Sequence, residues 1–445
     1  MMAIDHSLPL DLVGGDRDAH NARFGHMFDP WLTSSHRFIE VVGDNLILNW
    51  ERLEPPRQRR LREADRQNRD AIIRAVLANL AFAVATGIEP PVIGISLRAG
   101  KQKKTRYDRD GFAGLPRVVT LLAERLESDL LTLATSKEWG RASAITPGPN
   151  LLEHLRSFRF TAEHFHQLPG RESVWLSRTE RDFAGNVAGR ELIDYADTSE
   201  TIQYRAEMQR INDTLAAANL GLEPGNAPTT PTRLRALRRA FNLPADAPHG
   251  TERFDLGGRL FGGWWQALPR SRRHAVRIDG EPVADLDFSS MFLRLAYAEV
   301  GVKPPDGDLY ATIPGLSERR WRPGIKKVVS AMLFRTTPLV RAPKGTRSFL
   351  PSGLPASQLR SAILSAHPAL AGVFETGIGL RLMFRESQVL VAALLALAEE
   401  GAAALPMHDG LMVARSKADL AAGIMAEAAK AITGYYLPIS LEKHY

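Results

Sequence analysis

Two aspartates lie far apart in the sequence, and each stands where an extended segment ends. Asp287 closes the run VADLDF, just before a helical run that begins near Ser290. Asp409 lies in PMHDGLMV, whose His-Asp-Gly has the chemistry of a tight hairpin turn. Taken singly, Asp287 could cap the next helix and Asp409 could be a turn residue. At adjacent strand ends, two such carboxylates can hold two Mg²⁺ ions, as phosphoryl transfer to a nucleotide requires.

A basic segment, RRWRPGIKKVVSAMLFR, lies between the two aspartates and predicts a helix that Pro323 can start. Every fourth position along it carries a polar, basic or aromatic side chain: Arg322, Lys326, Ser330 and Phe334. Cations on such a stripe would neutralise a triphosphate, and the ring would support a base or sugar. An amphipathic helix with a basic outer face would give the same pattern. Combined with the aspartates, the stripe indicates template-directed nucleic-acid synthesis.

These side chains need a sheet and helices to position them. Strand alternation predicts that Asp285 and Asp287 share one face, and either Ser289 or Ser290 can cap the helix that follows. Apolar residues also alternate on both sides of the His-Asp-Gly turn. We therefore expect an antiparallel sheet floor that carries both carboxylates.

The same segments resemble the motifs of family A DNA polymerases and of the related single-subunit phage-type RNA polymerases. DFSSMFLRLA is similar to motif A, RPGIKKVVSAMLF to motif B, MHDG to motif C, and GRLFGGWWQALP to the elements before motif A. The resemblance covers about residues 255–445. It implies an α+β fold with a right-hand polymerase palm, an antiparallel sheet with helices, and helical fingers and thumb.

By position, the resemblance implies a role for each matching residue. Two Mg²⁺ ions, with Mn²⁺ as an alternative, would bind Asp287, Asp409 and the Phe288 carbonyl. Lys326 would also donate a proton to pyrophosphate. The incoming nucleotide would contact Arg322, Lys326, Ser330, Phe334, Phe292 and Ser290. The DNA primer-template would contact Arg259, Gln266, His408, Arg381 and Gln388.

Departures from the family pattern refine the expected activity. Phe292 stands where the DNA enzymes have Glu and would crowd a ribose 2′-OH, and Phe334 replaces a Tyr. Both changes favour dNTPs and therefore a DNA polymerase that extends a primer 3′-OH. Ser330 replaces an aromatic residue and Gly410 replaces the motif C Glu, so the sequence does not predict how tightly substrate binds or how accurate synthesis is.

The biological setting and two alternatives follow from the same reading. No acidic triad for a 3′–5′ exonuclease stands out in the N-terminal half, so we expect no proofreading. Replication of a mobile element, plasmid or phage is the expected setting. One alternative is a primase-like or phage-type RNA polymerase. The other is a non-enzymatic DNA-binding replication initiator with a degenerate polymerase core.

The first half divides by charge and breaker residues. Residues 1–65 form a helical, basic segment, and residues 66–165 have the order helix, strand, basic hairpin, strand. That order predicts a winged-helix-like nucleic-acid-binding domain with Lys137 and Arg141 on the wing and further phosphate contacts from KQKKTRYDRD. A small α+β module with a solvated basic loop would give the same order. Residues 166–245 predict a helical thumb-like region and linker, and residues 246–445 the palm, with reduced fingers at about 300–395.

Composition limits the class of protein. The chain has 445 residues, a hydrophobic content of 44%, a formal net charge of +7 and no cysteine. It can bury a large core, and disulfide frameworks, thiolate zinc sites and cysteine nucleophiles are excluded. The polar opening segment and short apolar runs predict no signal peptide and no membrane partner. We expect a cytoplasmic, nucleoid-associated protein, and the sequence leaves its oligomeric state open.

Overall fold

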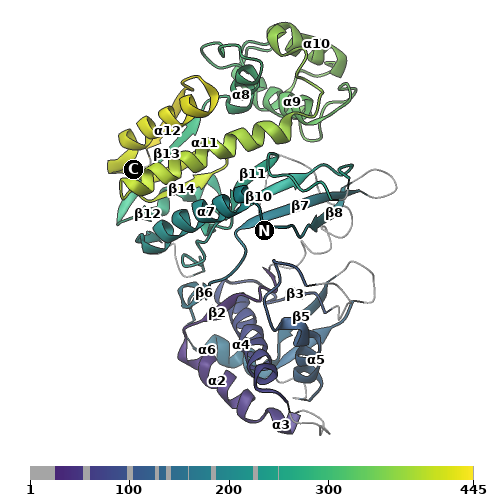
Figure 1. Ribbon diagram of the computed structural model, residues 1–445, viewed down its shortest axis with the longest axis vertical. Helices are drawn as coiled ribbons and strands as arrows, with labels where there is room; N and C mark the ends of the chain where they lie inside the picture. The colour runs from purple at the N-terminus through teal and green to yellow at the C-terminus, as the bar shows by residue number, and fades with distance from the viewer. Residues whose placement is uncertain are drawn as a thin grey trace.

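Apolar side chains gather in three clusters, which divide the chain into an N-terminal unit, a central sheet and a C-terminal α+β unit. The structure, a computed structural model, describes residues 26–53, 61–97, 104–125, 130–136, 142–158, 160–181, 187–223, 229–248 and 250–443. Figure 1 shows an elongated molecule with the N-terminal unit at one end and helices α8 (Met291–Glu299), α9 (Arg322–Phe334) and α10 (Ala356–Ala366) at the other.

The N-terminal unit is built around one long helix, α4 (Glu63–Ala85), which is buried over most of its second half. The run AIIRAVLANLAFAVA is apolar on nearly every side, as expected of a helix that packs against neighbours all round. The other helices are Arg37–Leu48 (α2), Trp50–Leu53 (α3), Leu115–Arg125 (α5) and Pro149–Ser157 (α6). The strands are His26–Met27 (β1), Leu32–Ser34 (β2), Ile93–Ile95 (β3), Leu131–Ala134 (β4), Ser143–Pro147 (β5) and Phe165–Gln167 (β6).

These strands form a sheet of order β1-β3-β5-β4 and a separate β2-β6 pair. The predicted strands on both sides of the basic turn are confirmed, since β4 and β5 pair antiparallel. The predicted wing residues Lys137 and Arg141 lie outside the described residues. Leu32, Ile39 and Trp50 share the core of α4 and β3–β5, so residues before position 66 belong to the same packed unit.

The central sheet has the order β11-β10-β7-β8, from strands Val174–Arg181 (β7), Val187–Leu192 (β8), Arg238–Leu243 (β10) and Gly257–Phe261 (β11). The mostly helical reading of residues 166–245 is therefore wrong for β7, β8 and β10. In β7, Val174 and Leu176 are fully buried while their neighbours are less so, the period of a strand. The helix predicted after them is confirmed as α7 (Ser199–Ala217), which starts at a Thr198–Thr201 capping box.

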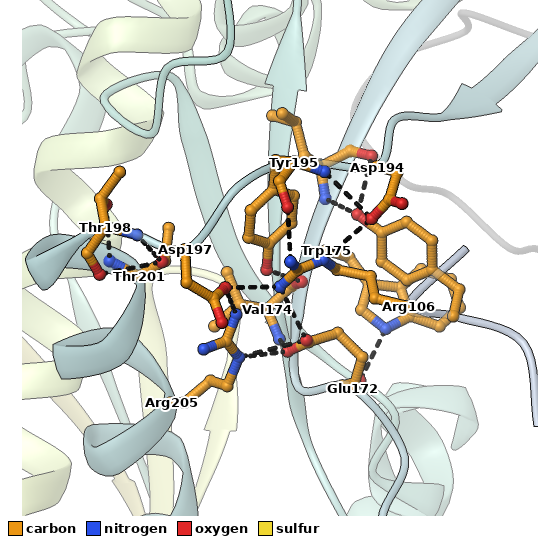
Figure 2. Close-up of polar contacts among 12 residues, drawn as sticks. Arg106, Glu172, Val174, Trp175, Asp194, Tyr195, Asp197, Thr198, Thr201 and Arg205 are labelled. Carbon is orange, nitrogen blue, oxygen red and sulfur yellow. Dashed lines mark hydrogen bonds and ion pairs between the residues drawn. The ribbon is translucent and has the colours of Figure 1, made fainter. Parts of the chain in front are cut away.

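A loop of the N-terminal unit, residues 104–110, docks on the central sheet (Figure 2). Arg106 forms ion pairs with Glu172, Asp194 and Asp197 at 3.3, 3.1 and 2.8 Å, and its guanidinium lies 3.6 Å from the centroid of the Tyr195 ring. Within the described part of KQKKTRYDRD, for which phosphate contacts were predicted, Arg106 is therefore taken up by contacts inside the protein. The Arg and Tyr side chains of this segment hold two parts of the protein together.

The C-terminal unit contains a mostly antiparallel sheet of order β14-β15-β13-β12-β9, with β16 also paired to β13. Its strands are Leu220–Leu222 (β9), Val276–Ile278 (β12), Glu281–Phe288 (β13), Ala404–Met407 (β14), Gly410–Ala414 (β15) and Ile439–Lys443 (β16). Helices α11 (Gly379–Glu399) and α12 (Ala418–Thr433) pack against each other and against this sheet. The expected mixed α+β fold with an antiparallel sheet is confirmed. Among the residues described, no helix combines the length and apolarity needed to cross a bilayer.

Candidate active site

The two aspartates meet at one end of the C-terminal sheet, as their strand-end positions predict. Strands β13 and β15 pair antiparallel with Asp287 opposite Gly410, the residue after Asp409. Hairpin β14–β15 pairs Met407 with Gly410, so His408 and Asp409 form its tip, with His408 at φ 53°. The Phe288 N–H donates to the Asp409 carbonyl oxygen at 3.2 Å, which ties the tip to β13.

The carboxylates lie close enough to repel each other. Asp287 keeps access to solvent at its strand end, but the surrounding protein atoms withdraw much of its hydration. This partial burial, and then the charges of Asp409 and Asp285, raise the pKa of Asp287 to about 6, against the opposing charges of Arg273 and Lys326. The site therefore favours a cation beside these oxygens.

The donor set suits a divalent ion that shares its coordination with substrate. Among the described residues, no group of three or more His, Cys, Asp or Glu side chains could form an all-protein cage. Mg²⁺ commonly binds proteins through one or two carboxylates and completes its shell with phosphate oxygens and water. Asp287 and Asp409 match that pattern.

Helix α9 begins as the sequence predicts, with Pro323 in its first turn, and its last residue is Phe334. Lys326 is exposed and has no ion pair or hydrogen bond among the described residues, while Ser330 is half-buried. The charge of Lys326 opposes the raised pKa of Asp287, so its ammonium lies within electrostatic reach of that carboxylate. Of the predicted stripe, Lys326 is thus the residue whose charge acts on the predicted carboxylates.

Arg322 has a partner that the sequence reading missed. Its Nε donates to the Asp308 carboxylate at 2.5 Å, and the guanidinium lies 5.3 Å from the Tyr310 ring centroid. Although burial opposes it, the hydrogen bond from Arg322 keeps the pKa of Asp308 below its ordinary value. A triphosphate at Arg322 would have to replace Asp308.

Two phenylalanines bring the start of α8 and the end of α9 together. The ring centroids of Phe292 and Phe334 are 5.7 Å apart, and the Arg259 guanidinium lies 5.4 Å from the Phe292 centroid. Ser290 occupies the N-cap position at φ 54° but makes no side-chain cap, so that expectation is wrong. Its hydroxyl instead donates to Asp308 at 3.3 Å.

Arg259 and Gln266, predicted to touch DNA, are committed to internal contacts. Arg259 makes a bidentate ion pair with Glu386, with its Nε and Nη2 at 2.5 and 3.0 Å from the carboxylate, and both residues are buried. Gln266 donates to the carbonyls of Leu260 and Pro406 at 2.9 and 3.3 Å. Both brace β11 against the helix and hairpin behind the aspartates.

The remaining predicted DNA contacts differ in their surroundings. Burial, and then the charge of Arg259, lowers the pKa of His408, so its imidazole is neutral at pH 7. Arg381 is exposed at the start of α11 and pairs with Glu299 at 2.6 Å. Gln388 is half-buried on α11, two residues beyond Glu386.

Glu386 was missed although one signal was present, since it is the single acid in the run GLRLMFRESQVLVAAL. Its charge and that of Asp409 both favour the neutral form of the buried Tyr310 hydroxyl, whose pKa is raised first by burial. Glu386 of α11 and Tyr310 of the loop before α9 therefore lie within electrostatic range of Asp409. Tyr310 and Asp308 stand in no segment that resembles a family motif, whereas Glu386 lies between the matched residues Arg381 and Gln388.

Gly410 is required by the approach of β13. A Cβ atom at this position would collide with the Asp287 carboxylate and with the Leu286 carbonyl oxygen. The close approach explains why no larger side chain follows Asp409 in this chain.

Neither a scan of protein-family models nor a search of curated proteins found a match to this chain. Among solved structures, the chain is similar to the POL domain of Pol1 from M. smegmatis, in its complex with DNA primer-template and dNTP. The identity is 10% and the TM-score 0.26, and the match covers 60% of this chain and 57% of that chain. The chain thus spans less than two thirds of that domain's length. Because the TM-score is so low, this likeness supports no conclusion about chemistry, and only the residues of the site bear on it.

Proposed function

We propose that this chain is a template-directed DNA polymerase that extends a primer 3′-OH with dNTPs. The meeting of Asp287 and Asp409 at paired strand ends, within reach of Lys326, carries this proposal. A site that concentrates negative charge beside a free lysine is suited to Mg²⁺ and a triphosphate. A purely structural turn or helix cap would require neither the concentrated negative charge nor the lysine.

Asp287 and Asp409 would hold the metal, with the Phe288 carbonyl as a further ligand. Bound Mg²⁺ would lower the pKa of the primer hydroxyl and offset negative charge on the phosphates. Arg322 would exchange Asp308 for a phosphate oxygen, and Lys326 would neutralise the leaving pyrophosphate and give it a proton. The primer oxygen gains the bond to the α-phosphorus as the bond to pyrophosphate breaks, and the hydroxyl proton leaves to solvent.

Phe292 and Phe334 would select the sugar. Their packed rings lie beside the buried Arg259–Glu386 pair. They form an apolar wall, without a hydroxyl group, at the start of α8. A ribose 2′-OH facing this wall would be desolvated without a hydrogen-bond partner, which disfavours ribonucleotides.

The N-terminal unit would bind nucleic acid as a winged-helix-like module. Its support is the order of elements, in which α5 precedes the β4–β5 hairpin and β5 pairs with β3 on its other side.

Single-nucleotide extension on four primed templates, each with a different templating base, tests the function. We expect each template to be extended with Mg²⁺ and only by its complementary dNTP, and not in EDTA. Addition independent of the template base would contradict template direction, and preferential use of NTPs would favour an RNA polymerase. No extension on any template would contradict the proposal.

A further inference from the structure

Arg238, the first residue of β10, is a half-buried cation without an acidic partner. Its guanidinium lies 4.4 Å from the centroid of the Trp175 ring on the neighbouring strand β7. Within the described residues, it has no ion pair and no hydrogen bond from its side chain. Burial, and then the charge of Arg171, lowers its pKa to about 10. The fold thus holds this cation with no direct partner and with only the charge of Asp29, which already pairs with Arg171, to offset it.

The nearest carboxylates are committed to other groups. The Oδ2 atom of Asp29 accepts hydrogen bonds from Arg171 at 3.1 Å and from Gln167 at 2.9 Å. Arg171 itself lies 5.5 Å from the Trp175 ring centroid, so two guanidinium groups share one ring and one acid.

Glu172, the other acid near this ring, is also occupied. It accepts from Arg205 at 3.0 and 3.1 Å, from Arg106 at 3.3 Å and from the Val174 N–H at 2.8 Å (Figure 2). Two arginines there face three acids, since Asp194 and Asp197 join Glu172. Arg238 and Arg171, by contrast, have only Asp29 near them, which leaves an excess of positive charge.

Removing a guanidinium from water without a counter-ion costs free energy, and folded proteins seldom retain such a group unless it serves a ligand. A guanidinium presents two parallel N–H groups to the oxygens of a phosphate. Because Arg238 and Trp175 are both half-buried, the site stays open to solvent. Its chemistry fits a phosphate oxygen.

The position of Arg238 links the site to the candidate active site. Arg238 pairs with Phe261 at the end of β11, and the chain then runs through Gly262 to Gln266, which donates to the Pro406 carbonyl. Pro406 lies in β14, the strand that leads into the His408–Asp409 tip. On the other side, Arg171 is paired with Asp29 of the N-terminal unit. A nucleic-acid strand that reaches from the candidate active site to the N-terminal unit would pass Arg238 and Arg171.

We propose that Arg238, together with Arg171 and Trp175, binds a backbone phosphate of the nucleic acid. The nature of the ligand rests on the proposed function, whereas the site itself rests on the uncompensated charge. It holds the strand away from the reacting atoms, so it adds affinity without taking part in catalysis.

The test compares Arg238→Gln with Arg210→Gln, which removes the same charge from an exposed arginine of α7 that pairs with Glu399. Fluorescence anisotropy of a labelled primer-template is measured in EDTA over a range of NaCl concentrations. For Arg238→Gln we expect affinity to fall about 3- to 10-fold and the slope of log K against log salt to shrink by about one. Arg210→Gln should bind like the wild type.

Thermal unfolding separates binding from structure. Loss of an uncompensated cation should leave the Tm of Arg238→Gln unchanged or raise it. A lower Tm with unchanged DNA binding would show that Arg238 supports the fold, and the proposal would be wrong. Wild-type protein that fails to bind the primer-template would overturn it as well.

Competition with tripolyphosphate distinguishes two sources of phosphate. Equal competition in wild type and Arg238→Gln supports a nucleic-acid site, and competition lost only in the variant assigns the site to free nucleotide and overturns the proposal. Because all binding is measured without metal, the result is independent of synthesis. An altered salt slope with no extension by the wild type would retain this site and reject the polymerase.

Discussion

At the level of single side chains, the defining feature is a carboxylate held beside other carboxylates. Asp287 is exposed at its strand end, but surrounding protein atoms reduce its hydration and it faces Asp409 and Asp285, which raises its pKa to about 6. An acid whose folded pKa exceeds its unfolded value near 4 destabilises the fold once it ionises. The metal-free protein should therefore lose stability as pH rises from about 4 through 6, and the destabilisation is fully present above that window.

Asp287→Asn should raise the Tm of the protein in EDTA at pH 8, because the amide cannot ionise, and should change it little at pH 4.5. Differential scanning calorimetry at both pH values measures this. Asp246→Asn, at an exposed aspartate, is the matched control. A Tm at pH 8 that falls in Asp287→Asn would show that the carboxylate is stabilising and that the repulsion is absent.

Mg²⁺ should reverse the destabilisation that ionised Asp287 causes. We expect millimolar Mg²⁺ to raise the Tm of the wild type at pH 8, because an ion that binds only the folded state stabilises it. The increase should be smaller in Asp287→Asn and in Asp409→Asn, and unchanged in Asp246→Asn. An equal increase in all four proteins would mean that the ion binds elsewhere.

Phe292→Ala should relax the choice of sugar. Opening the wall beside Phe334 gives a 2′-OH access to water, so the preference for dNTP over NTP should fall by about tenfold or more. Single-nucleotide kinetics with both substrates give the ratio of kcat/KM values. Phe292→Tyr keeps the bulk and should retain most of the preference, and an unchanged ratio in Phe292→Ala would exclude Phe292 from sugar selection.

Among the elements, those with local signals were predictable. Pro323 marks the start of α9, alternation marks β13, and His-Asp-Gly marks the tip of the β14–β15 hairpin. The strand-end positions of the two aspartates and the resemblance together predicted that they meet, but the register in which β13 pairs with β15 was not predictable, because it depends on contacts between distant segments. Strands β7 and β8 were missed because polar residues interrupt their alternation.

The partners of the site were harder to predict. Glu386 pairs with Arg259 from 127 residues away and Asp308 with Arg322 from 14 residues away, and nothing local to an acid indicates which arginine it will pair with. The same holds for Arg259 and Gln266, whose donors are used inside the protein. Residue type indicated the chemistry, and packing decided which groups stay free for substrate.

The β13–β15 contact predicts a severe effect of Gly410→Ala. The added methyl would collide with Asp287 and the Leu286 carbonyl, so β13 must move away, at a cost of about 1–3 kcal/mol. Chemical denaturation and primer extension should both report a loss. Gly423→Ala on α12, where a Cβ meets no atom, should be stabilising by about 0.5–1 kcal/mol. A fully active and stable Gly410→Ala would refute the observed register.

Across the whole molecule, the Arg106 loop joins the N-terminal unit to the central sheet (Figure 2). Arg106→Ala leaves Glu172 and Asp197 with Arg205 alone and removes the contact with the Tyr195 ring. We expect a lower Tm and faster cleavage between the two parts in limited proteolysis. Arg74→Ala, which breaks an exposed pair with Asp44, should change stability by less than about 1 kcal/mol. Equal rates of cleavage in both variants would show that the loop does not hold the two parts together.

The central claim is that Asp287 and Asp409 act together in nucleotidyl transfer. Single-turnover incorporation of one complementary dNTP, followed by rapid quench with saturating Mg²⁺, tests it most directly. We predict that Asp287→Asn and Asp409→Asn each slow the chemical step by about 10³-fold or more, equivalent to about 4 kcal/mol, while DNA affinity in EDTA is retained. Incorporation at the wild-type rate by either variant, with folding intact, would contradict the account.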